Sequence, residues 1–370
     1  MTRIRILVVD DSVVVRRLLC ETLSADPQLE VVGSASDGRI ALAKIAHFHP
    51  DLITLDVEMP VMNGLETLAQ VRKLHPKMPV VMFSTLTEHG ATATLDALSL
   101  GASDYATKPS NTGSPAASIA AIRAELIPKI KALCAGQVKK VTTILPPRPA
   151  APVRRPLHRR IEIVTIGTST GGPNALAEVL PQIPKNFPVP IVLVQHMPPI
   201  FTRLLADRLA AHCEIAVHEA SAGVIVSPGH AWIAPGNYHM RLRRAGTGWR
   251  LELNQDPPEN SCRPAVDVLF RSVAEACGAQ ALAVVMTGMG ADGVIGAQCI
   301  RQKGGEVIIQ DEASSVVWGM PGLVYASGQA DAVYPLNQLG QEITRRVLQS
   351  REPGMHDHQI EHDALEPRVR

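Results

Sequence analysis

The sequence has no long apolar run, no excess of charge of one sign and no closely paired cysteines. No stretch reaches the roughly 18 apolar residues that a transmembrane helix needs. The 36 Lys and Arg residues balance the 35 Asp and Glu residues, so the net charge of +1 gives no bulk attraction to nucleic acid or membranes. Six scattered cysteines favour reduced thiols over a disulfide framework. We therefore expect a cytoplasmic protein without membrane insertion and without a nucleic-acid partner.

The N-terminal stretch MTRIRILVVDD places acidic residues directly after a short apolar run. This arrangement is typical of neither a signal peptide nor a membrane anchor. With 370 residues, the chain is too long for one small core, and two globular domains are expected.

Composition divides the chain into four segments. Residues 1–135 and 161–350 alternate β-type runs with helical patterns, as two globular domains would. Residues 136–160 contain five Pro and seven Lys or Arg but no acid. Proline and like charges favour an extended linker there. The polar residues 351–370 are predicted to be a disordered tail.

The alternation of strands and helices predicts a doubly wound, parallel α/β sheet in each domain. Residues 223–254 look like β-hairpins and predict an antiparallel edge on the second, mainly parallel sheet. The predicted strands cover residues 4–9, 30–36, 51–55, 79–84, 103–107, 161–167, 190–195, 281–288, 306–310 and 330–334. The helices predicted for the second domain cover residues 173–180, 200–211, 264–277, 292–303 and 337–349.

Polar residues stand at the ends of four strands of the first domain. In a doubly wound sheet, ligands bind at the carboxyl ends of the strands. Carboxylates that converge there repel one another, and a hard cation such as Mg²⁺ relieves the repulsion. A carboxylate beside Mg²⁺ and a lysine can attack a phosphoryl group, whose oxygens the lysine and a serine hydroxyl would hold. Helix capping explains one acid but not the set Asp10, Asp11, Asp56, Ser84 and Lys108.

This set of residues resembles the receiver domain of two-component response regulators. The resemblance covers the first third of the chain and implies a flavodoxin-like fold. It implies that a sensor histidine kinase phosphorylates Asp56 and that Asp10, Asp11 and Asp56 bind Mg²⁺. The residues that would respond to the phosphoryl group are Ser84, Lys108 and Tyr105.

The segment GTSTGGP, residues 167–173, separates an apolar run from a predicted helix. It lacks the G-x-G-x-x-G spacing of a dinucleotide site and the Gly-Lys-Ser/Thr ending of a P-loop. It matches the G-x-S-x-G turn that raises a nucleophilic serine between a strand and a helix, and Pro173 suits the first helical position. Ser169 is therefore a candidate nucleophile and Thr170 a second one, with a simple turn as the alternative.

A nucleophilic serine needs a base, and the base needs an orienting group. His196 and Asp292 each follow a predicted strand, so we expect both at the same sheet edge as Ser169. Taken singly, His196 could be a core or turn histidine and Asp292 a helix N-cap. Together they favour acyl transfer, in which His196 takes the proton of Ser169 and Asp292 orients the imidazole. Backbone N–H groups near Thr170 and Met289 would stabilise the oxyanion.

Cys262 in the segment ENSCRPAVD could be a reactive thiol. No histidine is near it in the sequence, which favours a passive cysteine.

Six sequence blocks of the second domain resemble the chemotaxis protein-glutamate methylesterases of the CheB family. The blocks are IGTSTGGP, QHMPPIFT, APGNYHM, SCRPAVDVLF, TGMGADG and QDEASSVVWGMP, in this order between residues 160 and 350. The resemblance places the catalytic serine, histidine and aspartate of the family on Ser169, His196 and Asp292.

The resemblance implies hydrolysis of glutamate γ-methyl esters on methylated chemoreceptors, with release of methanol, and deamidation of receptor glutamines. A chemotaxis histidine kinase would donate the phosphoryl group, and catalysis itself would need no cofactor. We expect a monomer in which the unphosphorylated receiver covers the Ser169 cleft. The alternative is a response regulator whose second domain is a non-catalytic receptor-binding module.

Overall fold

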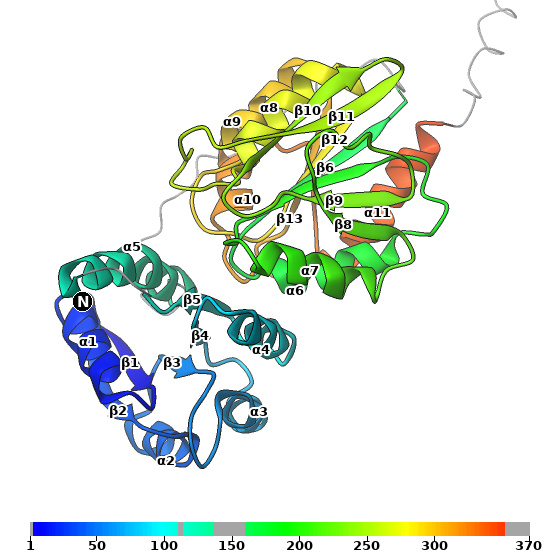
Figure 1. Cartoon of the computed structure of the whole chain (residues 1–370). Helices are drawn as coiled ribbons and strands as arrows, with labels where there is room; N and C mark the ends of the chain where they lie inside the picture. The colour runs from blue at the N-terminus through cyan, green and yellow to red at the C-terminus, as the bar shows by residue number, and fades with distance from the viewer. Residues whose placement is uncertain (1–2, 110–113, 136–159, 352–370) are drawn as a thin grey trace, which may run out of the picture.

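The computed structural model describes residues 3–109, 114–135 and 160–351. The predicted linker and tail therefore lie, except for one residue each, outside the described residues. Two α/β domains follow one another along the chain (Figure 1). The exact domain boundaries stay a prediction.

The N-terminal domain is built on a five-stranded sheet in the order β2-β1-β3-β4-β5. All of its strand pairs are parallel, and helices α2, α3 and α4 cover one face while α1 and α5 cover the other. This strand order is that of the flavodoxin-like folds, as predicted. The elements are β1 (Ile4–Val9), α1 (Val13–Ser24), β2 (Leu29–Ala35), α2 (Gly38–Phe48), β3 (Leu52–Asp56), α3 (Gly64–Leu74), β4 (Val80–Ser84), α4 (Glu88–Ser99), β5 (Asp104–Thr107) and α5 (Pro115–Leu133).

The C-terminal domain is built on a seven-stranded sheet in the order β14-β13-β12-β6-β7-β9-β8, again with parallel pairing throughout. Helices α6, α7 and α11 cover one face, and α8, α9 and α10 cover the other. The elements are β6 (Ile163–Thr168), α6 (Gly172–Val179), β7 (Ile191–Gln195), α7 (Phe201–Ala210), β8 (Ala216–Glu219), β9 (His230–Ile233), β10 (His239–Ala245), β11 (Gly248–Asn254), α8 (Val266–Cys277), β12 (Ala281–Val285), α9 (Val294–Gln302), β13 (Glu306–Gln310), α10 (Met320–Ala326), β14 (Ala332–Tyr334) and α11 (Leu336–Gln349).

The central strands are apolar along their whole length because both of their faces are covered. Every residue of β6, β7 and β12 is buried. Such continuous apolar runs are expected of a parallel sheet between two helical layers. The polar residues that follow these strands therefore lie together at the carboxyl end of the sheet.

The region predicted to form hairpins is only partly a hairpin. Strands β10 and β11 pair antiparallel as a separate two-stranded sheet, which packs against α8. The preceding strand β9 instead joins the main sheet, parallel to β7 and β8. Alternating side chains look the same in parallel and antiparallel edge strands, so the sequence pattern could not separate them.

The two domains contact each other through buried side chains next to the predicted nucleophile turn. The ring of Tyr105 on β5 stacks on Phe201 of α7, with centroids 4.7 Å apart and planes 9° apart. The hydroxyl of Thr170 donates a hydrogen bond of 2.8 Å to Asp104 Oδ2. Thr170 and Asp104 are 3% and 4% exposed, so this bond between the domains is shielded from water.

Polar contacts at the rim of this interface join α4 to the helices α6 and α7. Two ion pairs and one hydrogen bond are formed, the ion pairs being largely solvent-exposed. They are Arg203–Glu88 at 2.7 Å, Arg208–Asp96 at 2.8 Å, and Asn174 Nδ2 to the carbonyl of Leu98 at 2.8 Å.

Candidate active site

Ser169 stands in a tight turn between β6 and α6. Its N–H donates to the carbonyl of Thr287, and its carbonyl accepts from Gly172 N. The turn requires Gly171, whose φ of 77° is left-handed. It also requires Gly288 opposite, because a Cβ there would lie 2.9 Å from Ser169 Cβ. The sequence-predicted strand–turn–helix context of this serine is therefore present.

His196 and Asp292 come from different loops and meet at the same sheet edge. His196 follows β7 and Asp292 follows β12, the strands on either side of β6. His196 Nε2 lies 2.8 Å from Asp292 Oδ2. Because a carboxylate only accepts, Nε2 carries the proton of the neutral imidazole and the lone pair stays on Nδ1. The structure thus brings these two predicted partners together.

Asp292 is held in place by the start of helix α8. The N–H groups of Val266 and Asp267 donate to its two oxygens at 2.7 and 2.9 Å, and Asn260 Nδ2 donates at 3.1 Å. Burial raises the pKa of Asp292, but the hydrogen bonds from His196 and from these backbone groups outweigh it and lower the pKa. The helix N-terminus thus keeps the carboxylate ionised and fixes its orientation.

The basicity of His196 is set by two opposing effects. Burial lowers its pKa, but the hydrogen bond to Asp292 acts against burial, and the pKa of His196 lies above the ordinary value. The carboxylate thereby strengthens the imidazole as a proton acceptor.

No hydrogen bond joins Ser169 Oγ to His196 within the described part of the chain. Instead, the Sγ atom of Cys262 lies 3.5 Å from His196 Nδ1, the nitrogen that carries the lone pair. Cys262 was expected to be passive because no histidine is near it in sequence, but the fold places it against the predicted base. A turn brings it there: Asn260 and Ser261 have φ of 51° and 62°, and Glu259 and Cys262 exchange backbone hydrogen bonds.

The two predicted oxyanion donors have free N–H groups. Within residues 160–351 and the described N-terminal residues, no acceptor is found for the N–H of Thr170 or of Met289. Thr170 is 3% exposed, so its N–H is largely shielded from water. Met289 lies in the Gly-rich loop after β12, beside Gly288, where an added Cβ would meet Ser169.

The predicted phosphoryl site of the N-terminal domain is formed by the ends of β1, β3 and β5. Lys108 Nζ lies 2.9 Å from Asp10 Oδ2 and 2.7 Å from Asp56 Oδ2. One oxygen each of Asp10, Asp11 and Asp56 lies within 4.8 Å of the others, a spacing and donor type that fit Mg²⁺. Ser84 and Lys108 line the same cavity of about 120 Å³, together with Asp11 and Asp56.

Burial and charge alter the titration of this cluster. Burial, and then the neighbouring charge of Asp10, raise the pKa of Asp56 to about 6, although Lys108 acts against them. Burial lowers the pKa of Lys108, but its bonds to Asp56 and Asp10 raise the pKa more. Crowded carboxylates of this kind gain from a bound cation.

Tyr105 does not line the phosphoryl cavity. It is 3% exposed, with its ring against Phe201 of the C-terminal domain. Lys129 Nζ donates to its carbonyl at 2.6 Å. The ring of Tyr105 is therefore part of the domain interface.

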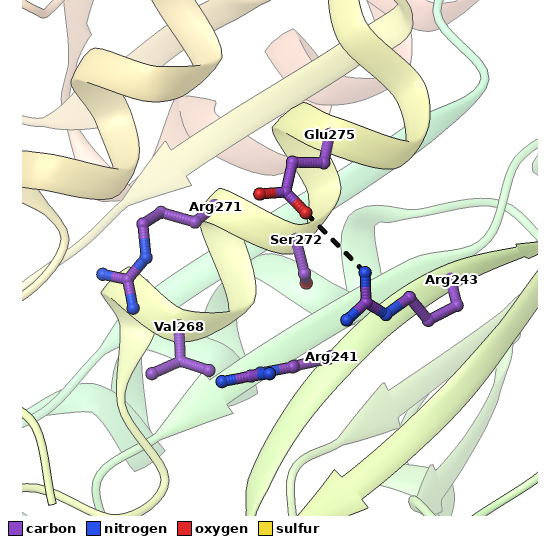
Figure 2. A pocket seen from close by; sticks show the side chains of 6 residues that line it. All are labelled: Arg241, Arg243, Val268, Arg271, Ser272 and Glu275. Atoms are coloured by element: carbon purple, nitrogen blue, oxygen red, sulfur yellow. Dashed lines mark ion pairs between the residues drawn. The ribbon is translucent and has the colours of Figure 1, made fainter.

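A separate cavity of about 180 Å³ lies between α8 and the hairpin strand β10 (Figure 2). Three arginines line it, but each pairs with a carboxylate, so the cavity is not a free anion site. The pairs are Arg241–Asp256, Arg243–Glu252, Arg243–Glu275 and Arg271–Glu259.

The fold and the two sites define a class of protein: a response-regulator receiver joined to an α/β domain with the constellation of a serine hydrolase. The model of the response regulator receiver domain matches residues 6–119, and that of the CheB methylesterase matches residues 164–343. Within the described residues, no helix is both long and apolar enough to cross a bilayer.

Known relatives assign the family. A protein-glutamate methylesterase/protein-glutamine glutaminase of Trichodesmium erythraeum is 54% identical over 351 residues, which cover 94% of this chain and 100% of that protein. A relative of the same name from Nocardioides sp. is 50% identical, and the match covers 95% of this chain and 97% of that protein. The crystal structure of the Thermotoga maritima CheB methylesterase catalytic domain is 43% identical, with a TM-score of 0.50, over 51% of this chain and all of that domain. The chain belongs to the CheB family of protein-glutamate methylesterases/protein-glutamine glutaminases.

Proposed function

We propose that this protein is a phosphorylation-regulated serine hydrolase that demethylates glutamate γ-methyl esters on chemoreceptors. The observation that carries the proposal is the partly buried His196–Asp292 pair, 2.8 Å apart, at the carboxyl end of the sheet from which Ser169 emerges. The names of relatives that match nearly the whole chain support the substrate. The protein would act in the cytoplasm as a monomer.

The reaction proceeds through an acyl-enzyme. Ser169 Oγ attacks the ester carbonyl while His196 Nδ1 takes its proton, and Asp292 stabilises the imidazolium. The N–H groups of Thr170 and Met289 bind the developing oxyanion, and one such donor contributes about 3–4 kcal/mol. His196 then protonates the leaving methoxide, and methanol departs. Water attacks the acyl-enzyme with His196 as base, which releases the glutamate and the Ser169 hydroxyl.

The same residues serve deamidation of receptor glutamines. An amide carbonyl gives the same acyl-enzyme on Ser169, with ammonia as the leaving group in place of methanol. The glutaminase part of the relatives' names supports this second substrate. No further catalytic group is needed, because the deacylation step is common to both reactions.

The N-terminal domain regulates the enzyme through phosphorylation of Asp56 by a chemotaxis histidine kinase. Asp10, Asp11 and Asp56 would hold Mg²⁺, which neutralises charge on the phosphoryl oxygens. Lys108 and Ser84 bind these oxygens, and Tyr105 passes the change to the interface. The unphosphorylated receiver covers the nucleophile turn, a proposal supported by the Asp104–Thr170 hydrogen bond.

The test follows methanol release from methylated receptor membranes. Wild type is compared with Ser169→Ala, His196→Gln and Asp56→Asn, each with and without an acyl phosphate as phosphoryl donor. We expect no release by Ser169→Ala and no stimulation of Asp56→Asn. Equal release by wild type and Ser169→Ala would disprove the assignment of the nucleophile.

A further inference from the structure

Gln195, the last residue of β7, is a buried amide that contacts both the nucleophile turn and the base. Its Nε2 donates to the carbonyl of Ser169 at 3.0 Å and to the carbonyl of His196 at 3.2 Å. Its side chain is 1% exposed. These bonds join two backbone segments that are 27 residues apart in sequence, counted from Ser169 to His196.

The orientation of this amide is determined by its partners. Both are carbonyl oxygens, which only accept, so the NH₂ group must face them. As a result Gln195 Oε1 points the other way and has no hydrogen-bond partner within the described residues. A buried acceptor without a partner is unfavourable and uncommon. The orientation of Gln195 is therefore determined by the two hydrogen bonds that its NH₂ group donates.

The chain leaves space for this side chain. Gly172 opens helix α6, and a Cβ on it would lie 2.0 Å from Gln195 Oε1. Glycine is therefore required at this position if the amide is to reach both carbonyls. The turn that carries Ser169 and the side chain of Gln195 are thus fitted to each other.

We propose that Gln195 is a positioning residue that fixes the separation of Ser169 from His196. The proposal rests on the function assigned to these two residues above. Ser169 Oγ and His196 share no hydrogen bond in this structure, so the geometry at the moment of attack depends on how their backbones are held. A misplacement of about 1 Å can reduce catalysis about 100-fold.

The test replaces Gln195 by methionine, which keeps the length and apolar volume of the side chain but removes both donors. We expect kcat to fall by about 10- to 100-fold with an unchanged KM. The acid limb of the pH–rate profile should keep its midpoint, because the contact of His196 with Asp292 is untouched. An altered midpoint with an unchanged plateau would contradict a positioning role.

Gln310→Met is the matched control. Gln310 is also a fully buried glutamine at the end of a strand of the same sheet, and it also bonds two backbone groups, Thr287 N and the carbonyl of Ser314. It touches neither Ser169 nor His196, so kcat should change much less for a similar loss of thermal stability. Equal losses of kcat in the two variants would show a merely structural role for Gln195.

Labelling of Ser169 by a fluorophosphonate separates this inference from the proposed function. The wild type should be labelled at Ser169 and Gln195→Met at least tenfold more slowly. Equal labelling rates would overturn the positioning role, whereas an unlabelled wild type would overturn the nucleophile itself. Should the methionine variant fail to fold, Gln195→Glu keeps the shape of the side chain and presents oxygen to both carbonyls, and the same slowing is expected.

Discussion

Replacing Asp104 by alanine should raise the activity of the unphosphorylated protein. Asp104 lies in the receiver, and its Oδ2 accepts the hydroxyl of Thr170 at 2.8 Å across the buried interface. A hydrogen bond to a charged group contributes about 1.5–3 kcal/mol. If the covered state limits activity, loss of this hydrogen bond lowers the ratio of covered to open protein by about 10- to 150-fold. Basal activity should rise by up to this factor, until it reaches that of the phosphorylated enzyme.

The substitution also removes contacts of Asp104 inside the receiver, where Asp104 Oδ1 accepts a hydrogen bond from Tyr105 N at 2.8 Å. Lys129 Nζ lies 3.5 Å from Asp104 Oδ2 and would lose this partner, but it retains Glu125 at 3.6 Å. Thr170 itself is unchanged, so the nucleophile turn keeps its sequence. The phosphorylated variant should therefore match the phosphorylated wild type.

The assay is the initial rate of methanol release from methylated receptor membranes, with and without an acyl phosphate. Asp51→Ala is the matched control, because Asp51 is also a receiver aspartate that accepts a hydrogen bond, from Arg5 N at 2.8 Å, but does not contact the other domain. It should leave basal activity unchanged. A folded Asp104→Ala protein with wild-type basal activity would refute the covering model.

Three further predictions concern the active site and the cation. In a pH–rate profile, activity should rise with pH along a limb centred above the ordinary histidine pKa of about 6.5, because protonated His196 cannot accept a proton. Asp292→Asn should move this limb to lower pH and reduce kcat by about 10⁴-fold. Cys262→Ala should keep or raise kcat, because the thiol competes with Ser169 for His196 Nδ1. Cys262→Ser introduces a stronger hydrogen-bond donor and should lower kcat about 2- to 10-fold. A loss of kcat in Cys262→Ala as large as in Ser169→Ala would contradict this competition. Chelation of divalent cations should abolish stimulation by acyl phosphate without changing basal methanol release, and stimulation that survives chelation would exclude Mg²⁺ from phosphorylation of Asp56.

The sequence predicted those parts of the site that follow from strand ends. Asp10, Asp56 and Lys108 converge, and His196 meets Asp292, because parallel strands share one carboxyl edge. Burial on both faces made the central strands apolar throughout, so that their ends were visible in the sequence.

Contacts made by loops between distant elements could not be predicted. Cys262 reaches His196 through a turn with two left-handed residues, 66 positions away in sequence. Gln195 looked like the last residue of an apolar strand, and nothing local indicates that its amide faces the carbonyl of Ser169. The pairing of β9 with the main sheet was missed for a related reason, since the partner of an edge strand is chosen by tertiary packing rather than by its own pattern.

The strand order also predicts that regulation through the receiver would act on the turn from one side. β6 lies between β12 and β7, and each neighbour sends a side chain to the turn: Thr287 Oγ1 donates to the carbonyl of Thr170 at 2.9 Å, and Gln195 Nε2 donates to that of Ser169. These two contacts lie within the C-terminal domain, so we expect them to stay if the domains separate. The third contact, from Asp104 to the side chain of Thr170, comes from the receiver. A phosphorylation signal can thus release the turn at Thr170 while the sheet continues to hold the nucleophile, so we expect phosphorylation to change access to Ser169 more than its intrinsic reactivity.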